Sequence, residues 1–199
     1  MTYLAVTPMS EGLVCDPQPA EIPLVTNALA RMNAQYIDIC SLDIDAIVNP
    51  AHADLLSGGG LDGMIHDAAG PDLLNACRAL NGCKVGEAKT TPGFNLSARW
   101  VIHTVGPIWR GDNQGEAQQQ LASCYRRCLE AAVAVDAASL AFPGISTGLH
   151  RFPVELAAAI AVREVSRFLM DSGSPKTVLF ACFDNTSLTA YERLLGGSV

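Results

Sequence analysis

The sequence has little positive charge and no basic run. Its 199 residues include 13 Lys and Arg against 20 Asp and Glu, which gives a formal net charge of −7. Proteins that bind the phosphate backbone of DNA or RNA normally do so with clustered Lys and Arg. We therefore expect no DNA partner, and we expect any phosphate-bearing ligand to be held by backbone N–H groups and helix dipoles.

The chain also lacks a long apolar run. The longest uninterrupted apolar stretch, Leu156 to Val162, is far too short to cross a bilayer, so no membrane partner is expected. The first eight residues have neither a basic region nor a long apolar run, so no secretory signal is expected. The seven cysteines are odd in number and scattered, which is typical of a reducing compartment. These features predict a cytoplasmic protein.

Segments typical of strands and helices alternate from Gln35 onward. The expected strands are Gln35–Ile39, Ala46–Asn49, Glu87–Thr91, Trp100–Val105, Leu140–Pro143 and Val178–Phe183. The expected helices are Leu61–Ala69, Pro71–Leu80, Glu116–Val135, Pro153–Met170 and Ser187–Leu195, with Pro153 at the first helical position. Several strands are almost continuously apolar, as expected when helices cover both faces of a sheet. The pattern predicts an α/β protein, a three-layer α/β/α sandwich with a mixed, largely parallel sheet.

The domain organisation follows from where this alternation begins. Residues 1–31 contain four prolines and have only a weak pattern, so they are interpreted as an N-terminal extension. Residues 32–199 are interpreted as one domain, because the length and the hydrophobic content of the chain suit a single core.

Two glycine-containing loops each lie between an expected strand and an expected helix. Gly58, Gly59 and Gly60 precede the first helix, and Gly144 to Gly148 follow the strand that ends near Pro143. Glycine leaves the backbone unhindered, and the N-terminus of a helix attracts anions, so each loop is a candidate anion site. Because ligands of such sheets lie at the carboxyl ends of the strands, we expect one ligand with more than one phosphate there.

The histidines and cysteines show no zinc-ligand spacing, so no metal and no cofactor are expected. Cys124 and Cys128 lie on the apolar stripe of a predicted helix, which favours core packing over a metal pair. His66 lies on the helix after the first loop and His103 within an apolar strand, so both are interpreted as structural. The first loop lacks the Gly-x-Gly-x-x-Gly arrangement, which argues against a dinucleotide-dependent oxidoreductase.

Seven short segments, in this order and at this spacing, resemble the macrodomain family. Within it they are most similar to the MacroD-type branch of O-acetyl-ADP-ribose deacetylases and mono-ADP-ribosyl hydrolases. The segments are Asp45–Asn49, Gly58–His66, Ala68–Pro71, Gly82–Cys83, Gly86–Lys89, Val101–Pro107 and Ile145–Gly148. The resemblance runs from about Tyr36 to Leu195 and implies a cleft for ADP-ribose or its derivatives, with mono-ADP-ribosylated proteins as further partners.

The resemblance also implies roles for single residues. Asp38 matches the acidic residue that accepts the adenine amino group, and Phe183 an aromatic residue near the adenine. Gly58, Gly59 and Gly60 border the distal ribose, and the 146–148 segment contributes backbone contacts to the diphosphate. The complete set of implied ligand-binding residues is Asp38, Ile39, Asn49, Gly58, Gly59, Gly60, Gly144, Ile145, Ser146, Thr147, Gly148, Leu149, His150 and Phe183. Asp62 matches the carboxylate that hydrolytic members need beside the distal ribose, where it orients or deprotonates a water.

Three of the departures from the family's pattern concern its hydrolytic members. His52 stands where related hydrolases commonly carry a second asparagine, His150 where they carry tyrosine, and Arg151 where they carry glycine. Two hypotheses cover His52: a neutral imidazole that binds the distal ribose hydroxyls, or an acid or base that titrates near neutral pH. With Asp62 it forms the expected catalytic pair of a hydrolase. The alternatives are an ADP-ribose-binding module without turnover and an enzyme that acts on ADP-ribose 1″-phosphate.

Overall fold

A six-stranded sheet forms the middle layer of the computed structural model, which describes residues 27–196. The strands are β1 (Met32–Tyr36), β2 (Ala46–Pro50), β3 (Ala88–Pro92), β4 (Trp100–Thr104), β5 (Ser139–Phe142) and β6 (Thr177–Cys182). They lie in the order β1-β6-β5-β2-β4-β3, and every pair is parallel except β3 with β4. The expectation of a mixed, largely parallel sheet is confirmed.

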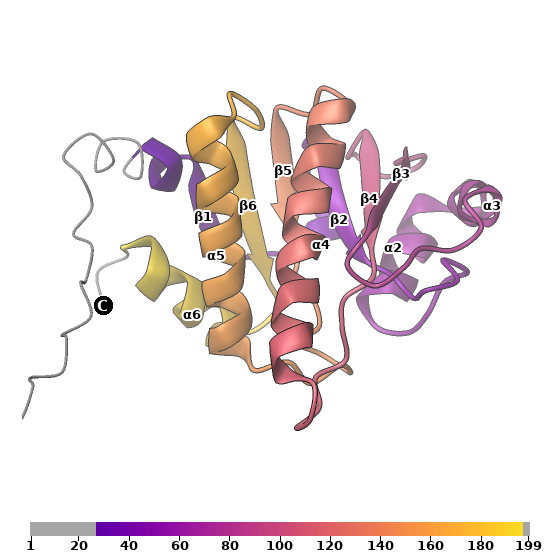
Figure 1. Ribbon diagram of the computed structural model, residues 1–199. Coiled ribbons are helices and arrows are strands. Elements are labelled where there is room, and N and C mark those ends of the chain that lie inside the picture. Colours follow the sequence, from indigo (N-terminus) through magenta and orange to yellow (C-terminus); the bar gives the residue numbers. More distant parts are fainter. Residues whose placement is uncertain (1–26, 197–199) are drawn as a thin grey trace, which may run out of the picture.

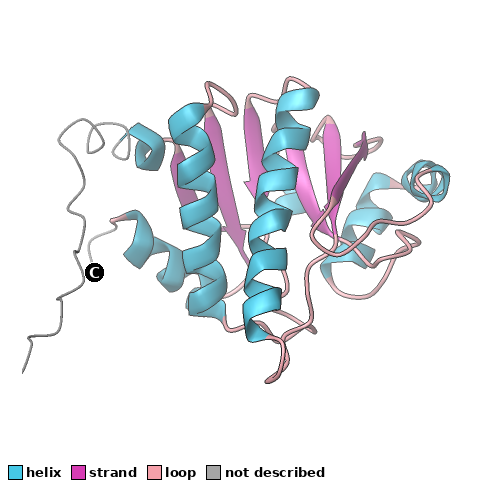
Figure 2. Ribbon diagram, in the orientation of Figure 1, coloured by secondary structure: helices cyan, strands magenta, loops and turns pink. Residues whose placement is uncertain are grey.

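Helices cover both faces of this sheet (Figure 1). They are the 3-10 helix η1 (Ile39–Ser41) and the α-helices α2 (Leu61–Ala69), α3 (Pro71–Ala79), α4 (Gln114–Ala134), α5 (Val154–Asp171) and α6 (Asn185–Leu195). Figure 2 shows α4 and α5 side by side over one face, with α2 and α3 on the other side. Within residues 27–196, none of the helices combines the length and apolar character needed to span a membrane.

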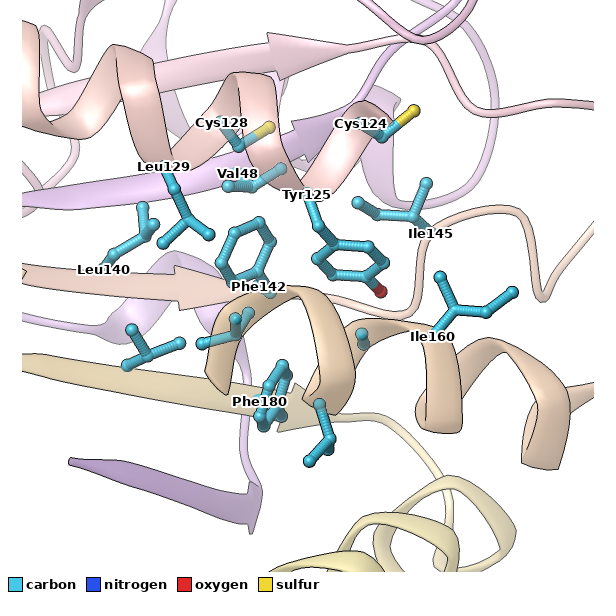
Figure 3. Packing of buried hydrophobic residues seen from close by; sticks show 14 of the residues in the cluster. Val48, Cys124, Tyr125, Cys128, Leu129, Leu140, Phe142, Ile145, Ile160 and Phe180 are labelled. Atoms are coloured by element: carbon cyan, nitrogen blue, oxygen red, sulfur yellow. The ribbon is translucent and has the colours of Figure 1, made fainter. Parts of the chain in front are cut away.

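Successive side chains of a strand point to opposite faces of the sheet, and this alternation divides the core into two clusters. In β5, Leu140 and Phe142 face α4 and α5, whereas Ala141 between them faces α2 and α3. Figure 3 shows the larger cluster, in which Cys124 and Cys128 lie among apolar side chains. Both thiols are buried, and that burial raises the pKa of Cys124 to about 11. These two cysteines are core residues, as expected from their helical stripe.

The first strand differs from its prediction. Gln35–Ile39 was expected to be extended, but β1 ends at Tyr36, and Ile39 begins the 3-10 helix η1. The Asp38 side chain accepts a hydrogen bond from the backbone N–H of Cys40, which ends the extended backbone and turns Ile39 into the α2-side core. A short side-chain cap therefore outweighs the apolar alternation of this segment.

Two helix starts also differ from their predictions. Pro153 is the N-cap of α5 rather than its first residue, and its carbonyl accepts the first intrahelical bond from Ala157. Helix α6 begins at Asn185, before the expected Ser187, because the Asp184 side chain accepts from the Ser187 backbone N–H and caps the helix. The remaining predicted elements lie within two residues of their observed bounds.

The described chain begins with a helical turn at residues 27–30 that belongs to the folded body. Ala28 is buried in the α4-side core, and the Arg31 guanidinium donates to the carbonyls of Leu169 and Ser172 at the end of α5. Residues 1–26 of the expected N-terminal extension lie outside the described residues. The boundary at residue 32 stays a prediction.

Candidate functional site

A cleft of about 380 Å³ lies at the carboxyl ends of the parallel strands. The loops after β2, β5 and β6 all border it, and both glycine-containing loops meet there. The expected site residues that line it are His52, Gly58, Gly59, Gly60, Asp62, Gly144, Ser146, Thr147, Gly148, Leu149, His150 and Phe183. The position expected for a ligand of a parallel sheet is therefore the position of the cleft.

The loop after β5 presents a row of unpaired backbone N–H groups. Among the described residues, no acceptor takes a hydrogen bond from the backbone N–H of any residue from 144 to 150. Ser146 has a φ of 65°, in the left-handed region, so successive N–H groups turn toward the same side. The loop is closed behind this row, where the Phe152 N–H donates to the Ser146 carbonyl. Such a concave arrangement of amides binds anions.

Gly106, at the end of β4, supports this loop from below. A Cβ at Gly106 would collide with the Oγ of Ser146 and lie 2.8 Å from Cγ2 of Ile145. Only a glycine therefore allows the 106–107 segment to pass so close to the Ser146 loop. Gly106 belongs to the Val101–Pro107 segment that resembles the family, but the sequence alone does not predict it as a site residue.

The loop before α2 ends at a helix N-terminus that no side chain caps. Gly60 is the N-cap with a φ of 64°, and no described acceptor takes a hydrogen bond from the N–H groups of Gly59, Gly60 or Leu61. The first N–H groups of a helix have no intrahelical partner and carry the positive end of the helix dipole. This second group of amides therefore faces the cleft as another anion-binding element.

Asp62 joins this loop to the core of the α2 face. Its Oδ2 accepts from the Gly58 N–H at 2.7 Å, and its Oδ1 accepts from Nδ2 of Asn49 at 2.7 Å. The carboxylate is only 4% exposed, yet Asp62 lines the cleft. Because two hydrogen bonds fix the two oxygens, Asp62 holds the glycine loop in place and keeps a defined orientation toward the ligand.

Asn49 and His103 continue this polar network beneath the cleft. Nδ2 of Asn49 also donates to Nδ1 of His103 at 3.1 Å, so Nε2 of His103 carries the proton and donates to Thr91 Oγ1 at 2.9 Å. Burial lowers the pKa of His103 to about 3, with a smaller contribution from His66, so its imidazole is neutral. Both amide hydrogens of Asn49 are used, and its Oδ1 is buried without a described partner.

His66 lies next to this network on α2. Its Nε2 is 3.6 Å from Oδ1 of Asp62, and its side chain is buried. Cys77 on α3 also lies next to the network, with its Sγ 3.6 Å from Nε2 of His103. Burial raises the pKa of the Cys77 thiol to about 11. The burial of His66 and His103 agrees with their interpretation as structural residues. In addition, His66 lies beside Asp62 itself, and His103 accepts a hydrogen bond from Asn49, which is a partner of Asp62.

His52 lines the cleft at its rim, and its partner there is Asp54. Its side chain is 65% exposed, and its Nδ1 lies 3.0 Å from Oδ1 of Asp54 at the mouth of the cleft. The pKa of Asp54 is lowered, first by the hydrogen bond from the Leu56 N–H and then by the bond with His52. The structure therefore places His52 on the rim, where a nearby exposed carboxylate orients its ring.

His150 closes the same rim from the opposite loop. Its Nδ1 is 3.1 Å from the carbonyl oxygen of Pro107, so Nδ1 carries the proton and leaves Nε2 free. The His150 carbonyl in turn accepts from the Trp109 N–H at 2.9 Å. This histidine thus connects the loop after β5 to the loop after β4.

Four expected ligand-binding residues do not line the cleft, for different reasons. Asn49 lies beneath it in the polar network, and Ile39 and Ile145 are buried in the two core clusters, which leaves only their backbone atoms for a ligand. Asp38 caps η1 at the surface. Its segment lies beside the end of β6, because the Ile37 N–H donates to the Cys182 carbonyl at 3.1 Å next to Phe183.

Several residues line the cleft that sequence reasoning did not select. They are Pro50, Ala51, Leu61, Gly106, Pro143, Ala181, Cys182, Asp184, Ser187 and Tyr191. Asp184 could have been found, because Asp followed three residues later by Ser is a typical helix start. Tyr191 could not have been found, because nothing in the sequence near it shows that this part of α6 reaches the cleft. Within the described residues, no three His, Cys, Asp or Glu side chains gather closely enough to hold a metal ion.

Comparison with known proteins agrees with this geometry. Residues 48–161 match the family model described as Macro domain. The chain is 53% identical over 169 residues to a macro domain-containing protein of Mesorhizobium japonicum, covering 85% of this chain and 96% of that protein. It is 49% identical over 170 residues to a Salmonella typhimurium protein named O-acetyl-ADP-ribose deacetylase, covering 83% and 94%.

Solved structures give the same result. The fold is similar to that of the Oceanobacillus iheyensis macrodomain with ADP, with a TM-score of 0.78, 38% identity, and coverage of 82% of this chain and 88% of that one. It is also similar to the Trypanosoma brucei macrodomain in complex with ADP, with a TM-score of 0.79, 38% identity, and coverage of 85% and 71%. The match thus extends over most of the described residues.

Proposed function

This chain belongs to the macro domain family, and we propose that it binds ADP-ribose and hydrolyses the ester of O-acetyl-ADP-ribose. The observation that carries the proposal is the pair of loops at one cleft in which the N–H groups of residues 59–61 and 144–150 have no acceptor among the described residues. The relatives named O-acetyl-ADP-ribose deacetylase, at 49% identity, support the choice of ester. The complexes of similar macrodomains with ADP support the choice of ligand.

The diphosphate is held by amides rather than by cationic side chains. It carries two negative charges, and burying them without hydrogen bonds would be costly. The N–H groups of residues 144–150 bind it on one side, and those of Gly59 to Leu61 at the start of α2 bind it on the other. An acidic protein with a formal charge of −7 binds an anion in this way.

The adenine and the distal ribose lie at opposite ends of the cleft in this proposal. The adenine lies at the β6 end, beside Phe183 and the Asp38 segment. The distal ribose lies at the α2 end, beside Gly58 and Asp62. The ester is thereby presented to Asp62.

Asp62 orients the attacking water. Two of its acceptor sites are used by Gly58 and Asn49, and a carboxylate retains further lone pairs for a water. The water oxygen forms a bond to the ester carbonyl carbon, the bond from that carbon to the ribose oxygen breaks, and the ribose oxygen takes a proton. The products are ADP-ribose and acetate with a released proton. A positioned acid or base of this kind contributes roughly 10²–10⁴ in rate.

We further propose that mono-ADP-ribosylated proteins are substrates of the same cleft. ADP-ribose attached to a glutamate or aspartate side chain is, like O-acetyl-ADP-ribose, an ester between a ribose oxygen and a carboxylic acid. The distal-ribose end of the cleft opens at the exposed rim that carries His52, so a polypeptide has access to it. We also propose a reducing compartment such as the cytoplasm, because the described cysteines are all free thiols.

The proposal is tested by incubating the protein with O-acetyl-ADP-ribose and measuring acetate and ADP-ribose release, with calorimetry of ADP-ribose binding alongside. We expect saturable binding and release of both products in equal amounts. Binding without product would identify a reader module and overturn the hydrolase assignment. A faster reaction with ADP-ribose 1″-phosphate than with the ester would reassign the substrate.

A further inference from the structure

A second cavity of about 300 Å³ adjoins the cleft and has no role in ADP-ribose binding as described above. Its walls come from the ends of β2 and β4, the loop 108–113 and the first turns of α4. Four residues border both cavities, namely Ala51, His52, Gly106 and His150. The two cavities are therefore continuous along one rim, and the two histidines stand at the junction.

The junction lies at the end of the cleft where the ester is cleaved. A Cβ placed on Gly58 would be 3.7 Å from Cβ of His52, so the rim that separates the cavities touches the loop held by Asp62. A group attached to the distal ribose therefore points from the Asp62 end toward the second cavity. The diphosphate and adenine lie on the opposite side of this junction.

The second cavity is much larger than an acetyl group needs. An acetyl group occupies the space of roughly two waters, each about 30 Å³. The cavity has apolar walls from Val85 and Ile108, both of them partly exposed, and polar groups at its rim from Arg110, Glu116 and Gln120. A large pocket with apolar walls and a few polar groups is typical of a site for a larger ligand.

The charged groups of this cavity are open for a partner. Within the described residues, Arg110 forms no ion pair, and the Glu116 carboxylate accepts only from the Gln120 side chain. Two hydrogen bonds shape the loop that carries Arg110, because Asn113 accepts from the Arg110 N–H and donates to the Ile108 carbonyl. The Arg110 guanidinium therefore has no acidic partner in the part of the chain that the structure describes.

We propose that this second cavity binds the polypeptide side of a mono-ADP-ribosylated protein, which rests on the hydrolase function proposed above. The modified glutamate or aspartate reaches the junction, an apolar side chain next to it packs between Val85 and Ile108, and an acidic residue nearby pairs with Arg110. Hydrolysis follows the same bond changes as for acetate: water adds to the carbonyl carbon, the bond to the ribose oxygen breaks, and that oxygen takes a proton. The products are ADP-ribose, the free carboxylate of the protein and a released proton.

The test compares two substrates that both contain an ester on the distal ribose. They are O-acetyl-ADP-ribose and a peptide mono-ADP-ribosylated on a glutamate side chain with a flanking leucine and aspartate. Ile108→Trp narrows the second cavity, and Val133→Trp, at another partly exposed apolar position, is the matched control. We expect Ile108→Trp to lower kcat/KM for the peptide at least tenfold while kcat/KM for O-acetyl-ADP-ribose stays within twofold. Val133→Trp should change neither. Arg110→Glu should lower the peptide reaction about fivefold, by reversing the pairing charge.

An equal loss for both substrates in Ile108→Trp, or no loss for either, would overturn the proposal. The failure of the hydrolase function has a different signature, because the wild-type protein would then bind ADP-ribose and release no product. In that case the same variants are compared by affinity. A selective weakening of the peptide relative to free ADP-ribose supports the second cavity, and equal affinities reject it.

Discussion

The loop before α2 and the loop after β5 border the same cleft, but different interactions hold them in place. The first is fixed by side chains: Asp62 accepts from the Gly58 N–H and from Asn49, which His103 orients in turn. The second is fixed by its backbone, with Ser146 at a positive φ and Gly106 packed beneath it. In the function proposed above, the end of the cleft that performs chemistry thus depends on buried polar side chains, whereas the end that binds the diphosphate depends on backbone geometry.

The largest effect should come from removing the acceptor that fixes the first loop. We expect Asp62→Ala to lower the hydrolysis of O-acetyl-ADP-ribose by roughly 10²–10⁴ in kcat. It should also lower the free energy of unfolding by about 1–3 kcal/mol, since the Gly58 N–H and the Asn49 amide lose their acceptor. Asp67→Ala, at an exposed position of the same helix, is the control. If Asp62→Ala kept full activity, the claim that side chains of the first loop support the chemistry would be wrong.

A different variant should damage the second loop through its backbone. In Gly106→Ala the new Cβ collides with Ser146, so the row of N–H groups is displaced. We expect ADP-ribose affinity to fall by roughly ten- to a hundredfold and the free energy of unfolding by about 1–3 kcal/mol, the usual cost of overpacking. Calorimetry and thermal unfolding measure the two effects. Gly111→Ala, which has open space around the added Cβ, should change neither.

The polar network beneath the first loop should make stability depend on pH. The pKa of His103 is about 3 in the folded protein against an ordinary value of 6.5. The unfolded chain therefore takes up a proton below pH 6.5 that the folded protein does not, and this contribution to stability is lost as the pH falls from 6.5 toward 3. The slope approaches about 1.4 kcal/mol per pH unit. Denaturant unfolding between pH 7 and 5 should give a shallower slope for His103→Gln, and equal slopes would contradict this account.

The smallest effect is expected at the rim. His52 is exposed and paired with Asp54 rather than with Asp62. Because exposed ion pairs contribute little energy, we expect His52→Asn to change kcat less than about threefold. The profile of activity against pH should keep its shape in the variant. A lost inflection near neutral pH would instead show that the imidazole transfers a proton. The rim would then belong to the catalytic region.

The sequence was informative wherever the signal is local. Apolar periodicity located every α-helix from α2 onward and the sheet, and glycine next to an expected strand end located both loops of the cleft. The first strand was placed too late, because the Asp38 cap competes with extended backbone and only its hydrogen bond reveals the outcome. The sequence also did not show that the Asp54 carboxylate lies 3.0 Å from Nδ1 of His52, and the catalytic role of His52 stays a prediction.

What the sequence determined by itself is the α/β sandwich, the family, and the two amide-rich loops, because each follows from residues close together in the chain. The tertiary structure alone decided that Asn49 meets His103, 54 positions away, and that Asp62 completes the network from α2. It also decided that the ends of β2, β4 and α4 enclose a second cavity beside the first. Contacts of this kind join distant segments through the register of the sheet, and no local pattern encodes that register.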